Sequence, residues 1–192
     1  MAISLSKGGN VSLSQLEPGL KKVLVGLGWD ARSSDGTNFD LDVSAFMLSH
    51  NEKVISDQHF IFYNNTKSPD GSVMHTGDNR TGAGDGDDES VRINLERVPT
   101  ECTVVSLVVT IHDAEGSRLN FGQVRNSFIR ILNDEIGKEI VRYDLSEDYS
   151  TETALIFGQI YRNGSDWKFR AVGQGYSGGL AKICSQYGVS VE

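Results

Sequence analysis

The sequence predicts an all-β protein, an antiparallel β-sandwich that carries a short C-terminal helix. Three observations predict this class. Apolar and polar residues alternate in many short segments, as they do along strands that bury one face. The chain has 21 glycines but only 3 prolines, which favours tight turns between strands over a flexible linker. Clear helical spacing of apolar residues occurs only near the end of the chain.

The strand pattern runs through most of the chain. It is clearest at Val23, Val25 and Leu27, which occupy every second position. About ten such segments, roughly 12 residues apart and bounded by Gly, Asn and Asp, favour a sandwich, with a barrel as the second choice. In chain order the main segments are 23–27, 41–45, 60–62, 91–95, 103–112, 127–132, 139–145, 152–161 and 166–172.

The C-terminal helix is expected over Gly178–Gly188, and Gly188 suits its C-terminal cap. One face of this helix carries the apolar residues Leu180, Ile183, Cys184 and Tyr187. Segment 113–127 has room for a short helical turn. No repeat or break in composition divides the chain, so residues 1–192 are predicted to form a single domain.

Charge and composition disfavour several classes of function. The net charge is −8 and the 18 basic residues are scattered, which disfavours binding to nucleic acids or anionic membranes. No apolar stretch is long enough for a signal peptide or a membrane span, so we expect a cytoplasmic protein without direct membrane insertion. The two cysteines, Cys102 and Cys184, lie far apart and are expected to be reduced, isolated thiols.

The most distinctive chemistry lies between His75 and Glu89. Aspartate and glycine alternate there, and five acids with a single base carry half of the net charge of the chain. Two carboxylates about 4 Å apart repel by about 1 kcal/mol in water and by about 4 kcal/mol at an effective dielectric of 20. An ordered loop that gathers several of them therefore needs a cation, and glycines let backbone carbonyls approach it. The candidate ligands in this loop are Asp78, Gly82, Gly84, Asp85, Asp87, Asp88 and Glu89.

The donor set favours calcium, because hard oxygen ligands suit calcium, whereas zinc prefers His and Cys. The loop is not an EF-hand. Arg80 and Gly82 stand at two of the ligand positions of that motif, and Ala83 stands at its invariant glycine. The competing interpretation is a solvated acidic hairpin loop with no metal.

Further oxygen donors lie outside the loop. Asp40 and Asp42 are two positions apart on a predicted strand and share one face, which is either a ligand pair or an ordinary polar face. Asn64, Asn65 and Asp70 follow another strand, in a stretch that first of all predicts a turn. Together with the loop they exceed the about 6–8 oxygens that one calcium ion takes, so two ions are expected.

Six stretches of the sequence resemble the TerD-like family of bacterial tellurite-resistance and general-stress proteins. They are SLSKGGNVSL, VGLGWDAR, FDLDVSAF, FIFYNN, SPDGSVMHTGDNRTGAGDGDDES and FRAVGQGYSGGL. The resemblance extends from Ser4 to Gly188 and implies a calcium-binding β-sandwich. It places the acidic loop of the family on Asp78–Glu89 and its D-x-D strand on Asp40 and Asp42.

The resemblance also implies a setting for the protein. Members act in the cytoplasm with other proteins of the tellurite-resistance operon and, through them, with membrane-associated complexes. The phenotypes of that operon are tellurite resistance, phage inhibition and colicin tolerance. The expected function is therefore a non-enzymatic, calcium-dependent adaptor in the stress response.

An enzyme is the main alternative. The acidic loop would hold Mg²⁺ or Mn²⁺ for phosphoester hydrolysis, with His75 or His112 as the base. An extracellular calcium-dependent lectin is disfavoured because no export signal is evident. Residues 173–178 match G-x-G-x-x-G, but too little chain follows for a dinucleotide-binding unit. The pair His112-Asp113 has no nucleophile elbow beside it, and neither cysteine has the paired thiol that a reductase needs.

Overall fold

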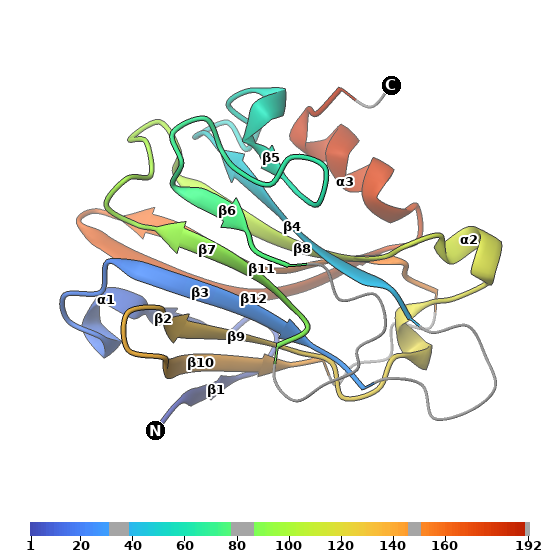
Figure 1. The fold of residues 1–192 in the computed structure, drawn as a ribbon, viewed down its shortest axis with the longest axis horizontal. Helices are drawn as coiled ribbons and strands as arrows, with labels where there is room; N and C mark the ends of the chain where they lie inside the picture. The colour runs from blue at the N-terminus through green and yellow to red at the C-terminus, as the bar shows by residue number, and fades with distance from the viewer. Residues whose placement is uncertain (31–38, 78–86, 146–150, 191–192) are drawn as a thin grey trace.

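The computed structural model describes residues 1–30, 39–77, 87–145 and 151–190, and this part of the chain forms two six-stranded sheets (Figure 1). Sheet A has the order β1 (Ile3–Leu5), β10 (Lys138–Asp144), β9 (Phe128–Asn133), β3 (Lys22–Gly28), β7 (Glu89–Asn94) and β6 (Val73–His75). Sheet B has the order β2 (Asn10–Ser12), β12 (Asp166–Tyr176), β11 (Ala154–Asn163), β8 (Val104–Ile111), β4 (Leu41–Leu48) and β5 (Phe60–Ile61). The predicted β-sandwich is confirmed.

The helices are short, and the longest is the predicted C-terminal one. They are α1 (Leu13–Leu16), η1 (Asp57–His59), α2 (Ala114–Ser117), η2 (Phe121–Gln123) and α3 (Gly179–Tyr187). Gly188 ends α3 with a φ of 76°, and its N–H donates to carbonyls of the last turn, as a glycine C-cap does. The short helices α2 and η2 fall within segment 113–127, where the sequence allowed a helical turn. Among the described residues, no helix has the length and apolar character needed to cross a bilayer.

The main core lies between the two sheets. Its side chains come from alternate positions of each strand, such as Val23, Val25 and Leu27 of β3. The facing sheet contributes Val43 and Leu107, both fully or almost fully buried. Burial of each such aliphatic side chain stabilises the fold by about 1.5–3 kcal/mol. Because alternate side chains of a strand point to the same face, the period-2 pattern in the sequence matches the residues of this core.

A second apolar cluster lies between the outer face of sheet B and α3 (Figure 1). The strands contribute side chains such as Phe46 and Val108, and the helix contributes Ile183, Cys184 and Tyr187. The central strands β4 and β8 are therefore buried on both faces. This explains why β8 is almost continuously apolar in sequence instead of alternating.

Three of the four edge strands of the two sheets were not predicted. β1 pairs in parallel with β10, β2 pairs with β12, and β6 pairs with β7. Each of the three has only three residues, too few for alternation to stand out, so the neighbouring strand determines that they are extended. The predicted segment 60–62 yields the two-residue strand β5.

Candidate functional site

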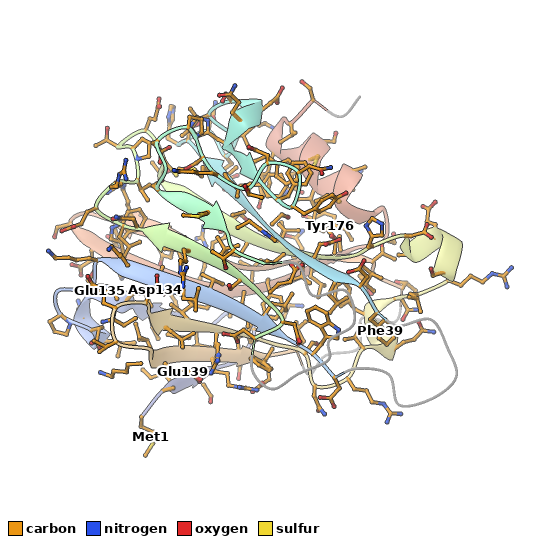
Figure 2. The ribbon with its side chains drawn as sticks, in the orientation of Figure 1. Met1, Phe39, Asp134, Glu135, Glu139 and Tyr176 are labelled. Atoms are coloured by element: carbon orange, nitrogen blue, oxygen red, sulfur yellow. The ribbon has the colours of Figure 1, made fainter. Side chains whose placement is uncertain are left out.

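The start of β4 and the start of β7 meet at one end of the sandwich (Figure 1). The backbone N–H of Val43 in sheet B donates to Glu89 Oε2 in sheet A at 2.5 Å. Phe39, which precedes Asp40 and Asp42, is buried at this end and is labelled there in Figure 2. The predicted D-x-D strand and the last residues of the predicted acidic loop are therefore neighbours in space.

Glu89 points into the interior. It is 2% exposed, and its Oε2 also lies 3.6 Å from Nε2 of His75, which is buried beside it. A buried carboxylate destabilises the folded state unless hydrogen bonds or an opposite charge compensate for its lost hydration. The Val43 N–H supplies one such bond, so this carboxylate holds the two sheets together at the site.

Asp42 lies on the outer face of sheet B, because its neighbours Leu41 and Val43 face the core. Its Oδ2 is 3.5 Å from Nδ1 of His112, which follows β8. The backbone N–H of His112 donates to the carbonyl of Asp40 at 2.8 Å. Both acids of the D-x-D pair therefore contact the end of β8, and Asp42 and His112 line a small cavity of about 170 Å³.

Asp88 lies beside the end of β3. Its N–H donates to the carbonyl of Leu27 at 2.8 Å, and its Oδ2 accepts the N–H of Trp29 at 3.0 Å. Burial raises the pKa of the Asp88 carboxyl, the charge of Asp87 raises it further, and the Trp29 N–H only partly offsets both. The ionised form of Asp88 is thus under-stabilised by the protein alone, and a nearby cation would reverse this.

Asp87 has a different environment. Both of its oxygens accept from Arg130 of β9, with Nε to Oδ1 at 2.8 Å and Nη2 to Oδ2 at 3.1 Å. Arg130 also contacts Glu139 at 3.1 Å, and its bonds to Asp87 are the main reason why the pKa of the guanidinium is raised. The Asp87 carboxylate lies over Gly26 on the outer face of sheet A, whereas Asp42 lies on the outer face of sheet B.

The predicted residues that follow β5 lie in turns. Oδ1 of Asp70 accepts the N–H of Ser72 at 2.7 Å and the hydroxyl of Ser68 at 3.2 Å. Burial would raise the pKa of Asp70, but these hydrogen bonds outweigh it and lower the pKa. The amide of Asn65 donates to the carbonyl of Phe60 at 2.6 Å, and Asn64 is exposed.

The remaining predicted ligands are Asp78, Gly82, Gly84 and Asp85, which lie outside the described residues. Within the part of the chain that the structure describes, no three His, Cys, Asp or Glu side chains come together as a metal site. The described acids Asp40, Asp42, Asp88 and Glu89 nevertheless share one end of the sandwich through the Val43–Glu89 hydrogen bond. The structure joins the two predicted segments there, and it gives Asp87, Asp70 and Asn65 other contacts.

Sequence reasoning missed Arg130 and the backbone donors at Val43 and Trp29. Arg130 is a lone base between Ile129 and Ile131, and its position on a strand is the only signal that it faces outward near acids. The set-aside motif at residues 173–178 spans the end of β12 and the turn into α3, in agreement with a strand-to-helix turn.

Comparisons with known proteins identify the family. The TerD domain matches residues 1–187 of the chain. The tellurium resistance protein TerD of Serratia marcescens is 64% identical over 190 residues, which cover 99% of each chain. General stress protein 16U of Bacillus subtilis (strain 168) is 54% identical over 192 residues, which cover 100% of each chain.

A solved structure shares the fold. The crystal structure of a Streptomyces coelicolor A3(2) homologue of the telluride resistance protein TerD superposes with a TM-score of 0.69 and 23% identity. The match covers 91% of this chain and 100% of that one. At this level of identity the likeness concerns the fold alone. Together with the full-length relatives, the domain match shows that this chain belongs to the TerD-domain family.

Proposed function

We propose that this protein is a calcium-binding, non-enzymatic adaptor of the stress response. The observation that carries the proposal is the junction of β4 and β7, where Asp40, Asp42 and Asp88 lie within a few residues of the Val43–Glu89 hydrogen bond. The names of the relatives, tellurium resistance and general stress, support the stress-response role.

The chemistry of the junction supports a cation. The pKa of Asp88 is raised by burial and by Asp87, so this carboxylate gains from a positive neighbour. The donors are predominantly oxygens, and hard oxygen donors in this number suit calcium. The ligands would come from Asp40, Asp42 and Asp88, together with Asp78, Gly82, Gly84 and Asp85 of the acidic loop. Because Asp42 faces the outer side of sheet B, we retain the expectation of two ions.

Calcium would have two effects here: it would neutralise the carboxylates and it would stabilise the folded chain. When bound, it supplies positive charge that cancels the repulsion among the carboxylates. Because it binds the folded chain and not the unfolded one, it raises stability. The loaded end of the sandwich would then be the docking surface for partners in the cytoplasm, namely other tellurite-resistance proteins and the membrane-associated complexes that they join.

The test is a calorimetric calcium titration of the EDTA-stripped protein in excess Mg²⁺, with thermal unfolding of the same samples. We expect saturable binding and a higher melting temperature for the parent. Asp88→Asn keeps the shape of the side chain and removes its charge, so it should fold as well as the parent without calcium and lose most of the calcium-induced rise. Asp57→Asn, an equal change of charge in η1, is the matched control. A full calcium response in Asp88→Asn would contradict this assignment.

A metal-dependent hydrolase is the second candidate, and the contact between Asp42 and His112 beside a cavity favours it. The cavity measures about 170 Å³, below the about 300–1,000 Å³ that substrate sites usually have. His112 is also 54% exposed, so it lacks the enclosure that tunes a catalytic base. Turnover of a phosphoester with Mg²⁺ or Mn²⁺ that is lost in His112→Gln would favour the enzyme over the adaptor.

A further inference from the structure

A groove on the outer face of sheet B lies away from the junction of β4 and β7. It follows α3 and the strands β2, β12 and β11, and its volume is about 520 Å³. Leu48, at the end of β4, and Val104, at the start of β8, mark its position. Asp42 and His112 lie at the other ends of these two strands, so the groove is separate from the proposed calcium site. Its volume is within the range of ligand-binding pockets.

Arg170 of β12 lines this groove and is held in place from its buried side. Its Nε donates to Oε1 of Gln159 at 2.7 Å, and its guanidinium carbon lies 4.7 Å from the centre of the Tyr161 ring. Gln159 is itself held, because its amide donates to the hydroxyls of Ser106 and Tyr187, each at 3.4 Å. Those two hydroxyls are 2.8 Å apart and buried. This network spans the three strands β8, β11 and β12 and the helix α3, and it orients the guanidinium before any ligand arrives.

The outer edge of the same guanidinium has no partner among the described residues. Neither Nη1 nor Nη2 makes a hydrogen bond or ion pair there. Three other arginines are paired with acids: Arg92 with Asp134, Arg142 with Asp144, and Arg130 with both Asp87 and Glu139. A fixed guanidinium with an open pair of donors matches the two oxygens of a carboxylate.

The other residues that line the groove indicate which chemical class of ligand it would bind. Among the described residues that line the groove, Arg170 and Glu52 alone carry a charge, so their charges cancel. A dianion such as phosphate needs a second positive charge, which the described lining does not supply, whereas a monoanion is matched by Arg170 alone. The amides of Asn10, Gln174 and Gln186 supply hydrogen bonds to polar groups beside the anion. We propose that the groove binds a ligand through a single carboxylate seated on Arg170.

Two kinds of ligand present such a carboxylate: a small carboxylic acid, and a peptide with a free C-terminus. The test uses the full ¹⁵N-labelled chain and follows by NMR the Arg170 Nε–Hε signal and, in every variant, the side-chain amide signals of Gln174 and Gln186, which line the groove. The probes are acetate, N-acetyl-dialanine with a free C-terminus, and the same peptide as its C-terminal amide. We expect saturable shifts with both acids and none with the amide. Tighter binding of the peptide than of acetate would assign a peptide terminus, and equal binding would assign a small acid.

Three variants complete the test. Arg170→Gln removes the charge and should weaken binding at least about tenfold, the effect of losing one charged hydrogen-bonded contact. Gln159→Glu places a carboxylate of the protein itself against Arg170 and should compete with the probe to a similar extent. Arg92→Gln, on the outer face of sheet A, is the matched control and should bind as the parent does. Equal shifts with the amide, parental binding by Arg170→Gln, or no saturable shift with either acid would overturn the proposal. None of these outcomes depends on calcium.

Discussion

Three consecutive acids of this chain occupy three different environments. Asp87 is ion-paired with Arg130 on the outer face of sheet A, Asp88 accepts a backbone N–H at the rim, and Glu89 is buried between the sheets. In sequence they form one acidic run. The fold separates them because only Glu89 belongs to β7, where it faces the core, whereas Asp87 and Asp88 precede the strand and bond Arg130 and the Trp29 N–H. Charge density in a sequence is thus a poor guide to which carboxylates share a cation.

The Asp87–Arg130 pair depends on a residue without a side chain. A Cβ on Gly26 would lie 2.2–2.4 Å from the Asp87 carboxyl group, closer than real contacts allow. Gly26 has no positive φ, so its backbone conformation is open to alanine. Space, and not backbone freedom, therefore requires glycine here.

We predict that Gly26→Ala destabilises the protein by about 1–3 kcal/mol, the usual range for overpacking. The added methyl group must displace Asp87 from Arg130 and leave both charges partly buried without each other. Urea unfolding measures the effect. Gly77→Ala is the matched control, because a Cβ there meets nothing within 4 Å and its φ is not positive. Equal stability of the two variants would show that the pair contributes nothing.

At the scale of elements, α3 is an example of a helix whose role is to cover a sheet. It has nine residues, too few for a stable helix in isolation, so packing must hold it in place. Ile183, Cys184 and Tyr187 are buried against the outer face of sheet B, and the Tyr187 hydroxyl bonds Ser106. The same helix forms one wall of the groove at Arg170. The helix therefore closes the second cluster and supports the network that orients Arg170.

We predict that Ile183→Ala lowers the free energy of unfolding by about 2–5 kcal/mol, as truncation of a fully buried isoleucine does. The comparison is Lys182→Ala, an exposed position of the same helix that should change stability by no more than about 0.5 kcal/mol. Thermal or urea unfolding measures both variants. If they lost the same amount of stability, α3 would not depend on its buried face.

At the scale of the whole molecule, the two cysteines report on two different parts of the interior. Cys102 belongs to the core between the sheets and Cys184 to the cluster beneath α3. Both are free and buried. Burial raises the pKa of Cys102 to about 12 and that of Cys184 to about 11, from a usual value of 9.0. The thiolate, the reactive form, is thus scarce at neutral pH in the folded chain.

These two pKa values predict the alkaline behaviour of the protein. Because the folded chain holds the thiol protons more tightly than the unfolded chain, this contribution to stability is complete below pH 9. It is lost as the pH rises through 11 and 12, so the free energy of unfolding should fall over that range. Urea unfolding at stepped pH measures the fall, and Cys102→Ala and Cys184→Ala should each reduce it.

The same thiols test whether the sandwich and α3 open together. In the parent at pH 8, a thiol reagent should modify Cys102 and Cys184 at one common, slow rate. Rapid modification of Cys184 alone would show that α3 opens independently of the sheets, in conflict with a single cooperative unit.

The sequence by itself determined the main elements of this protein. Alternation in β3 and β7, and the helical face of α3, are local patterns of burial that survive in any fold with two packed layers. The same patterns gave the sandwich class, and the motifs from Ser4 to Gly188 gave the family. These features can be predicted from the sequence because each depends on residues that are near one another in the chain.

Only the tertiary structure decided which acids become neighbours. Val43 and Glu89 are 46 positions apart, and Asp87 and Arg130 are 43 apart, yet each pair is in direct contact. Likewise, Arg170, Gln159 and Tyr187 form a network only because β11, β12 and α3 lie together. Strand order and register determine such contacts, and no local pattern encodes them, since each strand can pair with several others. Sequence thus supplied the chemical groups, and the fold determined which of them act together.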